Sequence, residues 1–317
     1  MRDPRKNKDT AGGGVGVVAV MIAMLALPSV LTLRTVNISS VADVSAKNPS
    51  PLGYTVSLLL FAVPIASIAF WFVPVEGIRI SKRSFWLTIG LLFPIGAALD
   101  FFFAHLFFTF PNPQATLCWR APALHGGVPV EEYLFYFLGF VAVLLIYIWL
   151  DEYWLKAYSV GEGAAERVNF DRLLRFHPGS VALGGLLITA GLVYKYFFSA
   201  ERDGFPGYWL FLVLGALVPS SALYSSAKAV VNWRAFSLTA YIILLTSLMW
   251  EVTLALPYGW WGFQERQMIG LRVTAWAGLP IEETVLWVTV TFTTVLVYEI
   301  VKRWKASGRP MRHAMLG

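Results

Sequence analysis

Eight apolar runs, each of about 20 residues, follow one another along this chain of 317 residues. A helix needs about 20 mostly apolar residues to cross the hydrocarbon core of a bilayer, so each run is long enough to span it. The runs occupy residues 15–33, 54–74, 85–110, 128–150, 180–198, 207–231, 236–256 and 278–301. The sequence therefore predicts an all-α, polytopic membrane protein with about eight transmembrane helices.

The charged residues are few, and their distribution orients the predicted helices. Only 14% of residues are charged, against about 25% in soluble domains, which excludes an ordinary soluble enzyme. The net charge of +6 does not indicate a nucleic-acid partner, because the Lys and Arg residues lie beside the apolar runs. Of the 25 Lys and Arg residues, 18 fall in alternate connecting segments. The positive-inside rule then predicts a multi-pass protein of the cell (inner) membrane with both termini in the cytoplasm.

Two similar segments indicate an internal repeat. Gly127-Val-Pro-Val-Glu-Glu132 and Gly278-Leu-Pro-Ile-Glu-Glu283 are 151 residues apart, and so are the intramembrane acids Asp100 and Glu251. We interpret this as two parallel three-helix repeats, related by an axis along the membrane normal. The expected units are an N-terminal segment with an extra helix (1–53), a first repeat (54–150), a cytoplasmic connector with a linking helix (151–206), a second repeat (207–301) and a basic cytoplasmic tail (302–317).

Six acidic residues recur in the repeats, and an ionisable side chain inside a spanning helix indicates a functional site. They are Asp100, Glu131, Glu132, Glu251, Glu282 and Glu283. The alternative is helix capping, because proline followed by acids is a common helix start. Two copies, each tied to an upstream acid, favour function over capping. Adjacent glutamates point about 100° apart on a helix, so one of each pair can face the bundle centre. A protonated acid beside an ionised carboxylate suits acid–base chemistry.

Aromatic residues crowd both predicted repeats. Aromatic faces can stabilise a carbocation, although for any single residue an interfacial belt or ordinary packing is the favoured explanation. The candidate substrate-contacting residues are Pro129, Pro280, Tyr133, Phe103, Trp250 and Trp287. No metal site is predicted, because the four histidines show no ligand spacing.

At residues 127–135 (GVPVEEYLF) and 278–283 (GLPIEE), the sequence resembles the lycopene cyclase domain of the small, membrane-integral type. In that family two three-helix subunits, or one fused chain, close the ends of a linear carotenoid. Its Pro-x-Glu-Glu segment opens the third helix of each unit and is regarded as catalytic. The resemblance implies a carotenoid end-group cyclase, an isomerase acting by protonation, ring closure through a carbocation and deprotonation, without net redox change.

The resemblance also implies partners and roles. The substrate would be a linear carotenoid within the bilayer, among membrane lipids, with other carotenoid-biosynthesis enzymes as further partners. No cofactor is evident, and a requirement for reduced flavin or nicotinamide stays open. We assign the proton donor to Glu131 and Glu282, with Asp100 and Glu251 as partners. Glu131→Gln or Glu282→Gln should then abolish cyclisation.

Two other classes of function fit the same residues. Intramembrane carboxylates in parallel repeats also suit a proton-coupled transporter. In a non-catalytic membrane scaffold the glutamate pairs would only cap helices. Cells that accumulate lycopene distinguish these interpretations, because only a cyclase would convert it to a monocyclic or bicyclic product. The ring type, the number of ends closed and the oligomeric state are left open by the sequence.

Overall fold

The computed structural model describes residues 50–160 and 177–310, together with the single positions 19, 23, 27 and 312. Apart from those single positions, the predicted run 15–33 lies outside the described residues. Most of the predicted polar connector, residues 161–176, and the end of the predicted tail also lie outside them.

Within the described residues, seven helices are long and apolar enough to cross a membrane. They correspond to the seven predicted runs after the first, with ends that differ by a few residues. Several of them change from α-helix to a wider π-helical turn along their length. In chain order they are α3–α5 with η2 (Gly53–Val75), α6 (Lys82–Phe107), α7 with η4 (Val130–Trp154), α9 with η6 (Pro178–Phe198), α10–α11 with η7 (Gly207–Ala227), α12 with η8 (Trp233–Ala255) and α13 (Ile281–Ser307).

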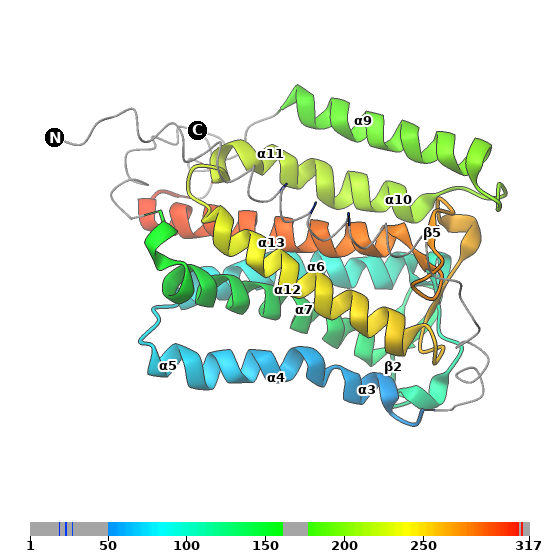
Figure 1. Ribbon diagram of the computed structural model, residues 1–317, viewed down its shortest axis with the longest axis horizontal. Helices are drawn as coiled ribbons and strands as arrows, with labels where there is room; N and C mark the ends of the chain where they lie inside the picture. The colour runs from blue at the N-terminus through cyan, green and yellow to red at the C-terminus, as the bar shows by residue number, and fades with distance from the viewer. Residues whose placement is uncertain are drawn as a thin grey trace.

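The long helices run side by side, with α9 at one edge of the bundle and α3–α5 at the other (Figure 1). The two helices that carry the glutamate pairs are the inner ones. Of the apolar span in α7 and α13, 67% and 56% of residues are buried, against 17–33% in the other five. The glutamate pairs therefore begin the two most enclosed helices of the bundle.

Short strands, which the all-α prediction did not include, gather at one end of the bundle (Figure 1). Strand β1 (Phe108–Thr109) pairs antiparallel with β4 (Gly262–Phe263), which explains why α6 ends before the predicted residue 110. Two hairpins, β2–β3 and β5–β6, each lead directly into a glutamate-bearing helix. Their strands are Arg120–Ala123 with Gly126–Pro129, and Arg272–Val273 with Leu279–Pro280.

Candidate active site

The two glutamate pairs lie in the first turns of α7 and α13. Pro129 and Pro280 immediately precede these helices in an extended conformation, with ψ of 138° and 140°. Proline has a fixed φ and no N–H, so it can close a hairpin and start a helix without leaving a donor unpaired. Both prolines are buried in this strand-to-helix junction, and neither lines the cavity described below.

The first glutamate of each pair anchors the loop that precedes its hairpin. Oε1 of Glu131 accepts hydrogen bonds from the backbone N–H of Leu117 at 2.7 Å and from the hydroxyl of Thr55 at 2.5 Å. Oε1 of Glu282 accepts one from the backbone N–H of Ile269 at 2.6 Å. Glu131 and Glu282, the expected proton donors, therefore hold loop backbone groups, and neither lines the cavity described below.

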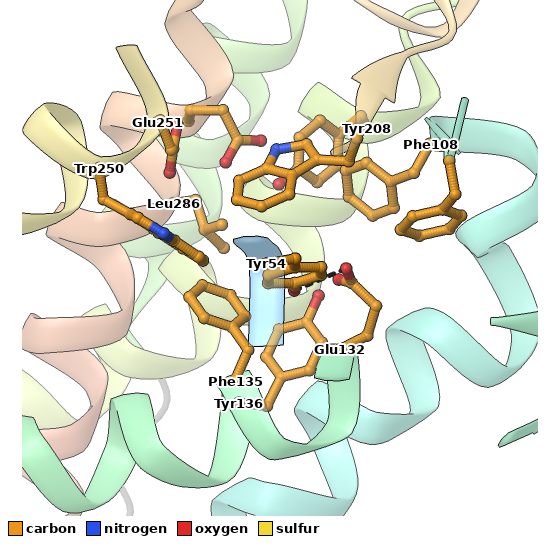
Figure 2. A pocket seen from close by; sticks show the side chains of 12 residues that line it. Tyr54, Phe108, Glu132, Phe135, Tyr136, Tyr208, Trp250, Glu251 and Leu286 are labelled. Atoms are coloured by element: carbon orange, nitrogen blue, oxygen red, sulfur yellow. Dashed lines mark hydrogen bonds between the residues drawn. The ribbon is translucent and has the colours of Figure 1, made fainter. Parts of the chain in front are cut away.

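The second glutamate of each pair faces a buried cavity of about 30 Å³, and Glu251 reaches the same cavity from η8 (Glu251–Ala255). Figure 2 shows Glu132 and Glu251 entering from different helices, with Tyr54 and Tyr136 near Glu132. The cavity has room for at least one water-sized group. Glu283 is the third carboxyl group at the cavity. The other residues that line it are Tyr54, Phe108, Phe110, Phe135, Tyr136, Tyr208, Trp250, Trp261 and Leu286.

Two tyrosines approach the cavity glutamates in corresponding ways. The hydroxyl of Tyr54, on α3 (Gly53–Ser57), donates a hydrogen bond to Oε1 of Glu132 at 2.7 Å (Figure 2). The hydroxyl of Tyr208, on α10 (Gly207–Phe211), faces Glu283 without a hydrogen bond of normal geometry. Both rings are almost completely buried. Glu132 thus has a well-formed hydrogen bond from its tyrosine, whereas Tyr208 is a looser donor to Glu283.

The upstream acids each have one side-chain donor. The hydroxyl of Tyr136 lies 3.4 Å from Oδ1 of Asp100, and the indole N–H of Trp287 lies 2.6 Å from Oε1 of Glu251. Tyr136 and Trp287 are 151 residues apart, as are their two acids. A phenol can donate and accept a proton, whereas an indole only donates a hydrogen bond, so the two donors are not equivalent.

The carboxyl groups are buried without cationic partners. Asp100, Glu132, Glu251 and Glu283 are 0–8% exposed. In the described part of the chain, the two ion pairs join Arg272 to Glu265 and Lys302 to Glu152, so neither involves these acids.

Three of their oxygens, Oδ2 of Asp100, Oε2 of Glu251 and Oε1 of Glu283, have no hydrogen-bond partner among the described residues. Glu283 is close enough to Glu251 and Glu132 for their charges to interact. Because several uncompensated charges cannot share one buried site, protons must be held among these groups.

Aromatic rings pack directly behind the carboxyl groups. The ring of Phe61 stacks on Trp287 with centroids 5.9 Å apart and meets Trp250 edge-on at 5.4 Å. Trp250 in turn contacts Phe135 at 5.1 Å and Trp261 at 4.7 Å. Such ring faces attract positive charge, so a cation formed in the cavity would be stabilised by its walls.

The six predicted substrate-contacting residues are not all at the cavity. Trp250 lines it and Trp287 bonds to Glu251, whereas Pro129 and Pro280 shape the helix starts. Tyr133 donates its hydroxyl hydrogen to the carbonyl of Pro122, away from the cavity. Phe103 is 37% exposed and packs on Phe107 and Phe211.

Sequence reasoning did not single out the cavity residues Tyr54, Tyr136, Tyr208 and Trp261. A shift of 151 residues aligns Tyr136 with Trp287, which is one of the six candidates, so comparing the two halves would have identified Tyr136. Tyr54 and Tyr208 are 154 residues apart, so the same shift misses them.

Comparisons of the chain with protein-family models, curated proteins and solved structures find no match. The chemistry of this site is therefore argued from its own residues. Those residues combine a concentrated, proton-sharing set of carboxyl groups with a closed aromatic wall. That combination suits proton transfer to and from an apolar molecule.

Proposed function

We propose that the protein is embedded in a membrane and cyclises the end group of a lipid-dissolved polyene such as lycopene by acid–base catalysis. The observation that supports this most is the convergence of Glu132, Glu251 and Glu283 on one aromatic-walled cavity. A hydrocarbon substrate offers no polar group to recognise. Its site therefore needs only a proton donor, a proton acceptor and a dry, cation-stabilising wall.

The outer surface of the bundle supports the membrane location. Large apolar side chains are exposed on several helices, including Phe70 at 83%, Leu186 at 66% and Leu214 at 55%. In water such a surface would be unfavourable, whereas lipid covers it. The connections after α5 and α11 carry basic residues and lie at the end opposite the strands (Figure 1). We therefore place that end in the cytoplasm and the carboxyl cavity toward the opposite face of the cell membrane.

Matching contacts in the two halves support the proposed duplication. Arg120 donates to the carbonyl of Gly127, and Arg272 donates in the same way to that of Gly278. The bonds from Leu117 to Glu131 and from Ile269 to Glu282 also correspond. Because each hairpin is closed and anchored by the same chemistry, we treat 54–150 and 207–301 as two copies of one three-helix unit.

The reaction adds a proton to one carbon of a terminal double bond. The neighbouring double bond attacks the resulting cation and closes a six-membered ring. Loss of a proton from an adjacent carbon then forms the ring double bond. The proton gained equals the proton lost and no electrons are exchanged, so the step needs no redox partner.

The hydrogen bonds suggest which carboxyl group donates the proton and which accepts it. Glu132 and Glu251 each accept a short bond from a fixed donor, which favours the ionised form. Tyr208 is a looser donor to Glu283, which lies close to both other glutamates. We therefore assign the proton donor to Glu283 and the final proton acceptor to Glu251. Glu131 and Glu282 are engaged by the loop N–H groups of Leu117 and Ile269, whereas Glu132 and Glu283 line the cavity.

Expression in cells that accumulate lycopene tests the proposal. We expect a monocyclic or bicyclic product and, in D₂O, a deuterium atom in each ring formed. Glu283→Gln should leave lycopene unchanged although the protein still accumulates in the membrane. If wild-type protein is present in the membrane and lycopene stays linear, the proposed function is wrong.

A further inference from the structure

A second, larger cavity adjoins the carboxyl cavity. It has a volume of about 180 Å³ and lies between α6, α7, the η7–α11 segment (Leu212–Ala227) and α13. Tyr136 and Leu286 line both cavities, so the two spaces meet at these side chains. We call the larger space the apolar groove.

The apolar groove suits a long hydrocarbon. No charged residue lines it, and the hydroxyl of Ser220 is already engaged by the carbonyl of Ala216 and by Thr293. Its lining on α13 extends from Leu286 to Val297, which is about 16 Å at 1.5 Å per residue. An elongated apolar chain lying here would present one end to the carboxyl groups.

The corresponding place in the other half of the bundle is filled. Gly215 lines the apolar groove seven residues after Tyr208, and Phe61 stands seven residues after Tyr54. Phe61 is only 2% exposed, because its ring packs between Trp250 and Trp287. A glycine thus leaves open on one side the space that a phenylalanine closes on the other.

Two further positions repeat this difference in size. Leu99 and Leu286 line the groove. A shift of 151 positions pairs Leu99 with Trp250 and Leu286 with Phe135, so each leucine corresponds to an aromatic residue in the other half. Trp250 and Phe135 pack against each other with centroids 5.1 Å apart. The apolar groove is therefore open where its counterpart in the other half is filled by aromatic side chains.

We infer that the apolar groove holds the body of a linear polyene with its end group against Tyr136 and Leu286, at the junction with the carboxyl cavity, so that the protein processes one end at a time. This inference rests on the proposed function for the identity of the substrate. The polyene is preferred to a lipid acyl chain as the occupant because the groove adjoins the cavity that holds the carboxyl groups, where an acyl chain has nothing to react.

Gly215→Phe tests the inference by placing in the groove the residue that closes the other half. A Cβ at Gly215 would meet only the ring of Phe211, at 3.7 Å, so the backbone accepts a side chain there. Leu214→Phe is the matched control, because Leu214 is next in the chain, 55% exposed and absent from the groove lining. Binding of lycopene to each purified protein in phospholipid nanodiscs is measured by quenching of tryptophan fluorescence, since Trp250 and Trp261 line the adjoining cavity.

We expect wild type and Leu214→Phe to bind lycopene equally and Gly215→Phe to bind it at least about tenfold more weakly, or about 1.4 kcal/mol. If Gly215→Phe binds as tightly as wild type, the groove holds only lipid and the inference is wrong. Should Gly215→Phe fail to fold, Ala216→Phe at the next groove position decides by the same criterion. Binding needs no chemistry, so lycopene that binds in a Gly215-dependent manner but is never cyclised overturns the proposed function alone. Full cyclisation by Gly215→Phe overturns the groove alone.

Discussion

The indole nitrogen of Trp287 lies 2.6 Å from Oε1 of Glu251, at the position where the other half of the bundle places the Tyr136 hydroxyl 3.4 Å from Asp100. The two acids are therefore held by donors of different chemistry. An indole N–H can stabilise a carboxylate but cannot pass on a proton, whereas a phenol can do both. The two settings are therefore chemically unequal, although both the acids and their donors are displaced by the same 151 positions.

Trp287→Phe should slow the reaction about tenfold to a hundredfold, because a hydrogen bond to a charged group is worth about 1.5–3 kcal/mol. The ring and its stacking on Phe61 are kept, so the change removes mainly the donor to Glu251. Product formation per folded molecule is measured by chromatography. Trp233→Phe is the control, since that indole donates only to the carbonyl of Lys228. Equal activity in both variants would show that Glu251 does not depend on the indole.

Tyr136→Phe should lower activity, whereas Tyr133→Phe should not. Both tyrosines lie on α7, but only the Tyr136 hydroxyl reaches an acid, and that of Tyr133 bonds to the Pro122 carbonyl. Loss of the Tyr136 hydroxyl removes the donor to Asp100 while leaving the ring that separates the two cavities. The initial rates of cyclisation of the two variants and wild type are measured at equal protein levels. A slower Tyr133→Phe would place the substrate on the outer side of α7 instead.

The two members of each glutamate pair should respond differently to amide substitution. Glu283→Gln removes the proposed donor and should lower the rate by at least about a hundredfold. Glu282→Gln keeps an oxygen that can accept from the Ile269 N–H, so it should retain most activity and lose some thermal stability. The rates and the temperatures of unfolding are both measured. If instead Glu282→Gln is inactive and Glu283→Gln is active, the first glutamate is the donor and the roles assigned here are reversed.

The helices could be predicted from the sequence because length and hydropathy alone determine a spanning run. The strand pair β1–β4 could not, since it joins residues such as Phe108 and Phe263 from the two halves. A contact of two residues leaves no periodic pattern in the chain, and it forms only when the helices bring their ends together. The contact between Tyr54 and Glu132 could not be predicted for the same reason, because it forms only when the first span packs against α7.

The sequence indicated the glutamate pairs as a candidate site but did not indicate which member of each pair faces the cavity. Spacing indicated that adjacent glutamates face different directions. Which of them faces the cavity depends on where the backbone N–H groups of Leu117 and Ile269 lie, and this is decided by loop conformation. Single residues likewise decide whether each space is open or filled. Gly215 leaves the apolar groove open, and Phe61 fills its counterpart.

A polar cluster at the opposite end of the bundle should affect stability without affecting catalysis. Asn232 caps α12 by accepting from the N–H of Ala235, and its amide donates to Asp151 at 2.8 Å. Its backbone N–H lies 3.3 Å from the hydroxyl of Tyr147, which donates to Glu299. Asn232 and Glu251 are 19 residues apart on one helical span, about 28 Å along its axis.

Asn232→Ala should lower the free energy of unfolding by about 2–4 kcal/mol, because it removes a helix cap and leaves a buried oxygen of Asp151 without its donor. Asn232→Ser keeps a capping oxygen and loses the amide's bonds to Asp151 and to the carbonyl of Leu155, so it should cost about half as much. Unfolding in detergent and product formation per folded molecule are measured for both variants. Because the cluster is remote from the cavity, the rate per folded molecule should equal that of wild type. A lower rate in Asn232→Ser would mean that this end of the bundle takes part in moving protons to the carboxyl groups.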